Sequence, residues 1–472
     1  MIRKRLVSLA IAAFVAGCAV TQPVPPKLDL PPGQATAAQN ELLQHWWTAF
    51  NDPVLTALIE EAFANNLDLK QALARIEASR ASVLLAQSYL YPSVNLNGNA
   101  NRSRISANTS PPLPSGAQVT NNSFALSLQA SYELDVWGKY RAGLLAAQND
   151  LLASRYYNET VRIAVAGDVA GAYFRMRAAD AEMTVLTDTL KLRTETVKLQ
   201  RDRFEGGIIG EYDLRLAEAE RSAVVADIAR TEQAILNFES AIATLVGRSP
   251  RAVFTPQVAR GASIEEVTEV PQLPPGLPSG LIERRPDVRR NEALLASSDL
   301  RIQEARAQYF PSLSLTGAYG LESAALSSLF SPAATIWSLG LGLVQPLIGL
   351  KNIEAQVEFA SARQTELTAV YAQTVQNAFR EVHDALVVNR TQRDVLAAET
   401  DRRNQTAKAY EVALLRYDAG RTSFLEVIDA QRQLLAAETL RISAARDAKL
   451  SLVDFAKSVG GGWSPEQFAA AR

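Results

Sequence analysis

The stretch RYDAGRTSFLE, from Arg416 to Glu426, decides the fold because it interrupts helical sequence on both of its sides. From Lys351 to Tyr417 the chain contains no Pro and no Gly, and apolar or small residues recur at the spacing of a helix that buries one narrow stripe. These residues are Ile353, Val357, Ala360, Leu367, Tyr371, Val375, Ala378, Val382 and Leu386. At about 1.5 Å per residue, this run reaches roughly 100 Å if it is helical throughout. We therefore predict a long helical hairpin that returns as far as Val459.

The same pattern occurs earlier in the chain. Residues 203–220, RFEGGIIGEYDLRLAEAE, match residues 416–433, RYDAGRTSFLEVIDAQRQ, at an offset of 213 residues. Residues 90–98, LYPSVNLNG, match residues 309–317, YFPSLSLTG, at an offset of 219 residues. The chain is therefore predicted to be a tandem duplication, in which each unit is half of one molecule.

After Pro92 the apolar spacing changes from that of a helix to the alternation of a strand. SFALSLQASYELDVWG alternates strictly over more than ten residues, which is long enough for a tilted membrane strand. We predict one β-hairpin over residues 93–137 and its copy over residues 312–347. The aromatic residues of these strands either lie at a lipid interface or pack like ordinary strand residues. They are Tyr132, Trp137, Tyr319 and Trp337.

Four strands per chain are too few to close a membrane barrel, since the smallest such barrels made from one chain have about eight. An open edge is not tolerated in hydrocarbon, so the strands require several copies of the chain. Two copies supply eight strands and three supply twelve, and a conduit needs the larger number. The residues alone favour three copies only if something passes through.

The composition argues against several other functions. One Cys and two His provide neither a disulfide nor a typical zinc site, and a formal charge of -2 gives no basic surface for nucleic acid. The motifs GxSxG, HExxH and GxxxxGK(S/T) are absent, so no enzyme is predicted. A lipid-anchored coiled-coil scaffold explains the helices but not the four strands, and it would give no conductance in a planar bilayer.

The first residues resemble a bacterial lipoprotein signal. Residues 1–17 combine a basic start with a short apolar run, and Cys18 follows as the site of acylation. The alternative is a plain secretory signal with a chance cysteine. Ala19 stands where an Asp would retain a lipoprotein at the inner membrane, so the outer membrane of a Gram-negative bacterium is predicted. Residues 18–50 form a Pro-rich tether, and no cofactor other than the lipid on Cys18 is expected.

The remaining chain divides at its Pro- and Gly-rich stretches. The first repeat covers residues 51–249 and the second covers residues 287–460. Between them, residues 250–286 are predicted to be a connector outside the helices, and residues 461–472 form a tail.

Several motifs together resemble one known family. Five motifs are similar to those of TolC-type outer-membrane efflux factors. They are the WW pair with FNDP, the stretch LPSGLIERRPDV, the two PS(V/L)xLxG hairpin entries, RYDAG followed by FLEVIDAQ, and the final VGGGW. The closest resemblance is to the lipidated NodT/OprM-like branch that serves resistance-nodulation-division pumps. The resemblance covers essentially the whole mature chain.

This resemblance implies a mixed α and β membrane protein that works as a homotrimer. Its two β-hairpins per subunit would contribute four strands to a trimeric 12-stranded β-barrel in the outer membrane, and its helical hairpins would form a periplasmic tunnel. A periplasmic adaptor, or membrane fusion protein, would link the tunnel to an inner-membrane transporter. The implied function is a passive conduit that exports drugs or other small toxic molecules. The alternatives are the exit duct of a type I protein secretion system or of a metal-ion efflux system.

The resemblance also implies site residues. Leu425, Asp429 and Arg432 match the positions that hold the periplasmic end closed, where three-fold symmetry would place an apolar ring above a carboxylate ring. Three facing carboxylates repel unless protons, cations or Arg432 neutralise them. The simpler interpretation is that Asp429 and Arg432 form an ordinary solvent-facing pair on one helix.

The two helical turns carry the remaining predicted sites. Gly207 and Gly420 can adopt positive φ and reverse the chain, and they follow Arg203 and Arg416. The resemblance implies that these tips face the adaptor. The alternative is that each arginine satisfies carbonyl groups at the end of its helix, and both roles can hold together.

Overall fold

The computed structural model describes residues 44–106, 118–265 and 284–463, together with residues 108, 111, 114 and 116. The predicted signal peptide, Cys18 and most of the predicted tether lie outside the described residues, as does nearly all of the predicted tail. The described chain forms two units. The strand unit contains residues 76–154 and 291–371, and the helix unit contains the described parts of residues 28–75, 155–290 and 372–472.

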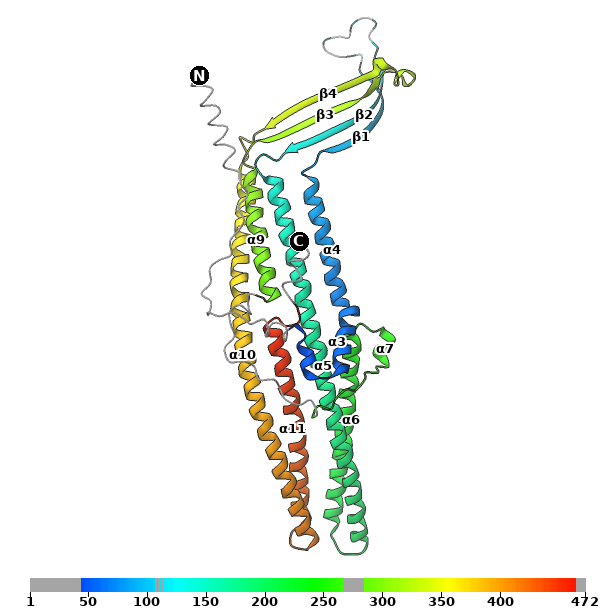
Figure 1. Ribbon diagram of the computed structural model, residues 1–472. Coiled ribbons are helices and arrows are strands. Elements are labelled where there is room, and N and C mark those ends of the chain that lie inside the picture. Colours follow the sequence, from blue (N-terminus) through cyan, green and yellow to red (C-terminus); the bar gives the residue numbers. More distant parts are fainter. Residues whose placement is uncertain are drawn as a thin grey trace, which may run out of the picture. The chain divides into compact units, whose positions relative to one another are not determined.

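The strand unit contains one four-stranded antiparallel sheet with the order β1-β2-β3-β4 (Figure 1). Its strands are β1 (Ser93–Arg104), β2 (Thr120–Leu134), β3 (Ser312–Ser323) and β4 (Thr335–Val344). Both predicted hairpins are therefore confirmed, one from each repeat. Among the residues that the structure describes, β1 and β4 each have a neighbouring strand on one side only, so they form the two edges of the sheet.

The register of the sheet places the alternating apolar residues on one face. Leu128 pairs with Leu96 on one side and with Tyr319 on the other, and Tyr319 pairs with Trp337. The next row on this face runs through Val94, Ala130, Gly317 and Leu339. Trp337 and Leu339 are 76% and 74% exposed. One face of the sheet is thus apolar across all four strands, and no described part of the chain covers it.

The opposite face of the sheet is polar or small except for Ile336 and Val344 on β4. Gln129 pairs with Asn95 and with Ala318, and Ala318 pairs with Ser338. A sheet with one apolar and one polar face separates two environments, which is the pattern expected of strands between lipid and water.

The long helices form two hairpins. In each hairpin a tight turn joins two helices, α5 to α6 in the first and α10 to α11 in the second. The described helices are η1 (Trp46–Phe50), α3 (Pro53–Asn65), α4 (Leu67–Ser88), α5 (Lys139–Glu205), α6 (Glu211–Leu245), α7 (Pro250–Phe254), α9 (Pro286–Ala307), η2 (Leu326–Ser328), η3 (Pro332–Ala334), α10 (Lys351–Asp418) and α11 (Phe424–Ser458). The run without Pro and Gly is one continuous helix, α10, of 68 residues. Asp52 caps α3 by accepting hydrogen bonds from the N–H groups of Val54 and Leu55, as its place before Pro53 predicts.

Three boundaries differ from the prediction. Residues 46–50 were assigned to the tether, but they form η1, because Trp46, Trp47 and Phe50 are buried in the core of the helix unit. Residues 250–286 were expected outside the helices, but Pro250–Phe254 forms α7 because Ser249 accepts a hydrogen bond from Ala252 and Pro250 suits the first helical turn. β2 ends at Leu134 although the alternation continues to Val136. The carboxylate of Asp135 instead accepts hydrogen bonds from the N–H groups of Tyr140 and Arg141, at the start of α5.

The core of the helix unit joins both repeats. Most of its buried residues come from η1, α3, α5, α6 and α11, and α4 and the segment after α7 add Leu69, Val258 and Ile264. The others include Trp47, Ile59, Tyr173, Phe174, Ile242 and Val453. Gly167 of α5 belongs to this packing, because a Cβ there would lie 2.3 Å from Cδ of Lys457 on α11. Glycine at this position lets the lysine cross α5 and bond to Asp168. No helix in the described part of the chain is both long enough and apolar enough to cross a membrane.

Candidate gate and helix tips

The turn between α5 and α6 is closed by a glycine. Gly207 has a φ of +71°, which side chains with a Cβ rarely adopt. Its N–H donates to the carbonyl of Phe204 at 2.9 Å, and the N–H of Ile208 donates to the carbonyl of Arg203 at 2.9 Å. This pair of bonds is the Schellman pattern, which satisfies carbonyl groups left over at a helix end.

The turn between α10 and α11 repeats that geometry. Gly420 has a φ of +65°, and its N–H donates to the carbonyl of Tyr417 at 2.9 Å. The N–H of Arg421 donates to the carbonyl of Arg416 at 2.8 Å. Both turns lie at the lower end of the helix unit in Figure 1. The predicted conformational role of Gly207 and Gly420 is therefore confirmed, whereas their contact with an adaptor stays a prediction.

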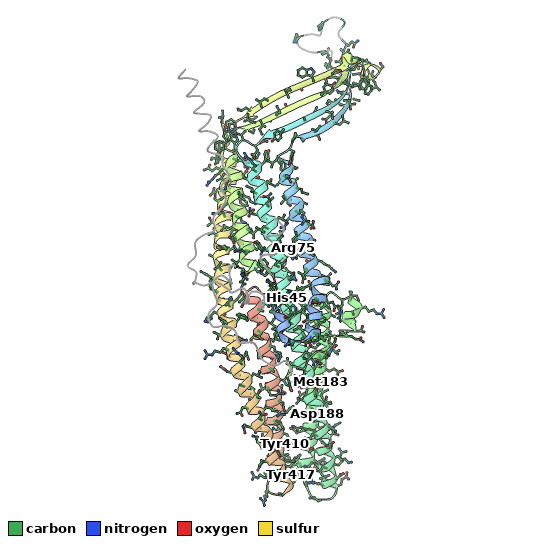
Figure 2. All side chains as sticks on the ribbon, viewed as in Figure 1. His45, Arg75, Met183, Asp188, Tyr410 and Tyr417 are labelled. Carbon is green, nitrogen blue, oxygen red and sulfur yellow. The ribbon has the colours of Figure 1, made fainter. Side chains whose placement is uncertain are left out.

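The two predicted tip arginines are used differently. The Arg203 guanidinium donates a 2.7 Å hydrogen bond to the hydroxyl of Tyr417 and lies 5.4 Å from the centre of its ring. Tyr417 lies near the end of α10 (Figure 2) and also accepts a 3.1 Å hydrogen bond from Gln200. Arg416, at the matching position of the second repeat, is exposed. Arg203 thus connects the first hairpin to the second.

A small apolar cluster supports this connection. Val197 of α5, Ala217 of α6, and Phe424 and Ile428 of α11 are buried together, with Tyr417 packed against them. These residues come from all four long helices, so the two tips are held as one body.

The predicted gate residues lie on α11, shortly after the second turn. Leu425 is 52% exposed, and Asp429 is exposed with its carboxylate accepting a 2.7 Å hydrogen bond from Gln433. Arg432 does not bond to Asp429. It donates to the carboxylate of Glu220 on α6, with Nε at 2.8 Å from Oε1. The structure therefore leaves Leu425 and Asp429 on the surface of the single chain and directs Arg432 to the first repeat.

Glu220 joins two arginines. Its second oxygen, Oε2, accepts a 2.7 Å hydrogen bond from Arg193 of α5, whose side chain is only 3% exposed. Burial raises the pKa of Glu220, but the hydrogen bond from Arg432 and the charge of Arg193 outweigh that effect, and the pKa is lowered overall. The carboxylate is therefore ionised at neutral pH and holds α5 and α11 to α6.

Sequence reasoning identified Arg432 but missed Arg193 and Glu220. At the offset of 213 residues, the second repeat has Thr406 and Gln433 at their positions. The available signal was that Arg193 and Glu220 are charged in the first repeat but have uncharged counterparts in the second. Such a difference indicates a contact that only one repeat makes.

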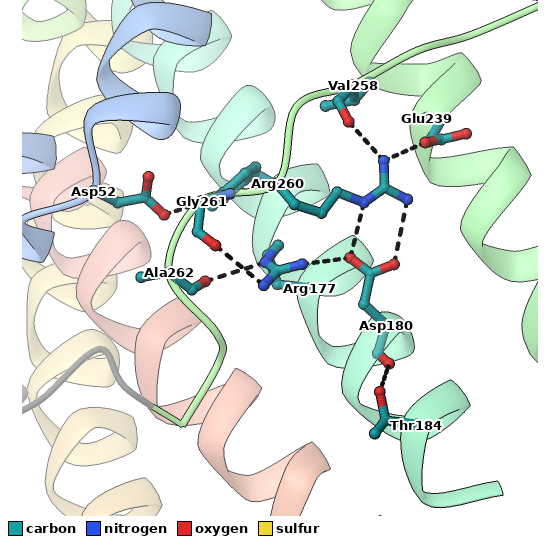
Figure 3. Close-up of polar contacts among 10 residues, drawn as sticks. Asp52, Arg177, Asp180, Thr184, Glu239, Val258, Arg260, Gly261 and Ala262 are labelled. Atoms are coloured by element: carbon teal, nitrogen blue, oxygen red, sulfur yellow. Dashed lines mark hydrogen bonds and ion pairs between the residues drawn. The ribbon is translucent and has the colours of Figure 1, made fainter. Parts of the chain in front are cut away.

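A second polar site lies in residues 258–265, which follow α7 and which we call the strap. Arg260 donates to both oxygens of Asp180 at 3.1 and 3.2 Å and forms an ion pair with Glu239 (Figure 3). Arg177 donates to the carbonyl of Ala262 at 3.1 Å and to that of Gly261 at 3.2 Å. The arginines thus satisfy the backbone of a segment that has no helix or strand partners of its own.

The strap also contacts the N-terminal cap of α3. Tyr173 donates a 2.5 Å hydrogen bond to Asp52 and accepts one of 3.1 Å from the N–H of Gly261. A Cβ at Gly261 would lie 2.2 Å from Oδ1 of Asp52, so only glycine fits there. Burial and the neighbouring Asp52 raise the pKa of the Tyr173 hydroxyl, which stays protonated and able to donate.

Lys449 fixes the far end of the strap to α11. Its side chain is buried, and Nζ donates a 2.6 Å hydrogen bond to the carbonyl of Ile264. Burial lowers the pKa of Lys449 to about 8, although the charge of Glu265 opposes this shift. Glu265 itself forms a 2.5 Å ion pair with Arg441 of α11. The strap therefore joins α5, α6 and α11, and it contains no predicted site residue.

These features together define a subunit of an outer-membrane channel. They are the amphipathic sheet with two open edges and the two helical hairpins whose tips are bonded to each other. Comparison with known proteins agrees. The model of the family described as outer membrane efflux protein matches residues 58–248 and 277–461, one segment for each repeat. The chain belongs to this family. The prediction that it is an efflux channel and not an enzyme is thereby confirmed.

Individual relatives cover the whole length of the chain. It is 30% identical to the probable efflux pump outer membrane protein TtgC of Pseudomonas putida, over 98% of this chain and 96% of that protein. It is 28% identical to the cation efflux system protein CusC of Escherichia coli, over 97% and 99%. The crystal structure of the Campylobacter jejuni CmeC outer membrane channel superposes with a TM-score of 0.86 at 25% identity, covering 95% of this chain and 98% of that one.

Proposed function

We propose that the chain forms a homotrimer in the outer membrane and serves as the passive exit duct through which a tripartite pump exports drugs or other small toxic molecules. The observation that carries the proposal is the sheet, which has an uncovered apolar face and two unpaired edges. Pairing β4 of one subunit with β1 of the next satisfies both edges, and three copies supply twelve strands. In such a trimer the apolar faces turn to lipid and the polar faces line the duct.

The assembly is tested by measuring the mass and the conductance of the detergent-extracted protein. We expect a particle of three chains that forms channels in planar bilayers. A stable single chain without conductance would refute the proposal.

We further propose that acylated Cys18 anchors the chain to the outer membrane. This residue lies outside the described part of the chain, and the proposal rests on the signal-like residues before it. Mass spectrometry of the mature protein should find a lipid-modified Cys18 at its N-terminus. An unmodified Cys18 would leave a plain secretory signal as the explanation.

The gate is proposed to consist of Leu425, Asp429 and Arg432. Leu425 and Asp429 are exposed in the single chain and four residues apart on α11, so a three-fold axis would bring three copies of each face to face. Their exposure supports this arrangement because they are available to a neighbouring subunit. Arg432, bonded to Glu220, would hold α11 against the first hairpin and keep the ring narrow.

Replacing Asp429 and Arg432 with Ala tests the gate. The double variant should conduct more, and should leak antibiotic-sized molecules, because both the ring and its tie are removed. Glu426→Ala is a matched control, since Glu426 is also exposed and acidic on α11 but lies outside the proposed set. Equal, tightly closed channels in all three proteins would exclude these residues from the gate.

The tips around Arg203, Gly207, Arg416 and Gly420 are proposed to receive the periplasmic adaptor, which connects the duct to an inner-membrane resistance-nodulation-division transporter. A trimer presents six such tips. Charge reversal of exposed Arg416 to Glu should weaken co-purification with the adaptor more than the same change at exposed Arg230, which lies farther along α6.

Metal-ion efflux is the second candidate, because the full-length relative CusC is named as a cation efflux protein. The two functions are separated by deleting the gene and measuring growth with drugs and with metal salts. Hypersensitivity to drugs alone supports the first candidate, and hypersensitivity to metal cations alone supports the second.

A further inference from the structure

The loop that joins β4 to α10, residues 345–350, exposes two large apolar side chains to solvent. Leu347 is 80% exposed, and Ile348, at 95%, is the most exposed large apolar side chain in the part of the chain that the structure describes. We call residues 345–350 the junction loop. Adjacent aliphatic side chains that are exposed to solvent often mark an interaction surface. The partner that covers them has to be inferred from neighbouring features of the molecule.

The backbone of the junction loop holds these two side chains outward. The Gln345 side-chain amide donates to the carbonyl of Tyr309 at 3.1 Å and to that of Pro346 at 2.9 Å. Gly349 then turns the chain with a φ of +83°, and α10 begins at Lys351. The Gln345 amide is thus bonded within the protein, whereas the side chains of Leu347 and Ile348 are left in solvent.

The exposed pair continues the apolar face of the sheet. Along β4, Leu339, Leu341 and Leu343 are 74%, 69% and 64% exposed. The junction loop follows directly after Val344, so the row of uncovered aliphatic residues extends past the last strand pair. A face that meets lipid along β4 is therefore followed, after only Gln345 and Pro346, by the exposed side chains of Leu347 and Ile348.

The same end of the sheet carries features of a membrane interface. Trp137 stacks on Phe310 with ring centres 4.9 Å apart, and its indole N–H donates a 2.7 Å hydrogen bond to the carbonyl of Pro311. Phe310 is 46% exposed. Lys351, directly after the loop, is exposed and can reach phosphate groups. Aromatic rings beside a cation are typical of residues at the level of lipid headgroups.

We propose that the junction loop inserts Leu347 and Ile348 into the outer part of the phospholipid leaflet at the end of the sheet where α4, α5, α9 and α10 join it. Each subunit contributes one such wedge, and the wedges fix the depth at which the sheet sits in the bilayer. The proposal rests on the lipid-facing orientation of the apolar face that is proposed above. Its occupant is lipid, and a second copy of the chain is the alternative that the test must exclude.

The test places a polarity-sensitive fluorophore on single introduced cysteines in the full chain, reconstituted into phosphatidylcholine and phosphatidylglycerol vesicles. Ile348→Cys reports on the wedge, and because Ile348 is 95% exposed, the substitution removes little packing from the fold. Leu339→Cys reports on the sheet face. Phe254→Cys on α7 is the matched control, because its side chain is 89% exposed but belongs to the helix unit. The unsubstituted chain gives the background from Cys18.

Nitroxide lipids and aqueous iodide then distinguish the environments. We expect the label at residue 348 to be quenched at least twofold more by a nitroxide near the headgroup than by one near the acyl-chain end, and to resist iodide. The label at residue 339 should be quenched by the deeper nitroxide, and the label at residue 254 only by iodide. Leu347→Cys should repeat the result for residue 348.

Each other outcome overturns the proposal. Iodide quenching at residue 348 would place the loop in water, and quenching by neither agent would place it against a neighbouring subunit. If residue 339 is quenched by lipid and residue 348 is not, only the wedge is refuted. If neither is quenched by lipid, the orientation of the sheet is refuted as well.

Discussion

The guanidinium of Arg203 donates a 2.7 Å hydrogen bond to the hydroxyl of Tyr417, and so joins the end of α5 to the end of α10. The two residues come from matching parts of the two repeats. Tyr417 corresponds to Phe204 of the first repeat, and Arg203 corresponds to Arg416 of the second. Because Phe204 has no hydroxyl, Arg416 cannot form the equivalent bond with it. The duplication supplies two similar tips, and this difference joins them.

Tyr417→Phe should destabilise the tips. Gln200 is 1% exposed, and its amide loses the hydroxyl acceptor together with Arg203. An unpaired buried polar group costs roughly 1–3 kcal/mol. Thermal unfolding of the purified channel measures the effect. Tyr212→Phe, at a 69% exposed tyrosine of the first tip, is the control and should leave the melting temperature unchanged. Equal melting temperatures for both variants would contradict the role of the hydroxyl.

Glu220→Ala should cost more than the change at Tyr417. Arg193, 3% exposed, would be left as a buried charge without its carboxylate, which typically costs about 3 kcal/mol. The variant should also conduct more, since Arg432 is released. Glu218→Ala removes a nearby carboxylate of α6 that pairs with Arg201 and Arg215, and it should have little effect. Chemical denaturation and bilayer conductance of both variants provide the comparison.

The stability contributed by Glu220 should disappear in acid. Its pKa in the folded chain is lowered from the ordinary value of 4.5, so its contribution is complete above pH 4.5 and is lost as the pH falls through the lowered value. The melting temperatures of the parent and of Glu220→Gln should therefore differ at pH 6 and approach each other as the pH falls below 4.5. A constant difference over this range would show that Glu220 is not the titrating group.

Lys449→Met should remove a dependence on alkaline pH. The pKa of Lys449 is lowered from 10.5 to about 8, so the unfolded chain binds the proton more tightly and the folded chain gains stability as the pH rises from 8 to 10.5. The full gain is roughly 3 kcal/mol. Melting temperatures of the parent, Lys449→Met and the exposed control Lys408→Met across this range test the expectation. A gain that persists in Lys449→Met would assign the titration to another group.

Gly420→Ala should cost about 1 kcal/mol, because the new Cβ meets no atom within 4 Å but the φ of +65° is unfavourable for alanine. Gly210→Ala is the matched control, since Gly210 has equal space and a φ of -78°. Gly247→Ala should be worse than both, because its Cβ would lie 2.3 Å from the carbonyl oxygen of Asn65. Denaturation of the three variants should give this order, and an equal loss at Gly210 would contradict it.

The sequence predicted the features that depend on neighbours along the chain. Gly207 and Gly420 are recognisable because a tight helical turn needs positive φ, and the strands are recognisable because alternation in one strand matches alternation in the next. The continuous helix α10 follows from the absence of Pro and Gly. The open edges of the sheet follow from the small number of strands.

Contacts between distant segments were not predictable in this way. The binding of Arg432 to Glu220 spans 212 positions, and that of Lys449 to Ile264 spans 185. Nothing in the spacing of either residue selects its partner. A glycine inside a helix lowers its stability, and the reason for Gly167 in α5 is visible only in the structure, where the Lys457 side chain crosses α5 at this position. Such pairs depend on how the helices pack against one another. The apolar pattern shows which face of a helix is buried, but not which helix packs against that face.

The uninterrupted 68-residue span of α10 limits how this chain can change in length. Deleting one residue from the middle of such a helix shortens it by about 1.5 Å and rotates everything beyond the deletion by about 100°. Tyr417 would then turn away from Arg203, and the buried stripe would face water. The helix can therefore change length only in steps close to seven residues, and its partner helix must change by the same amount. Insertions and deletions in α10 should thus be tolerated far less than single substitutions.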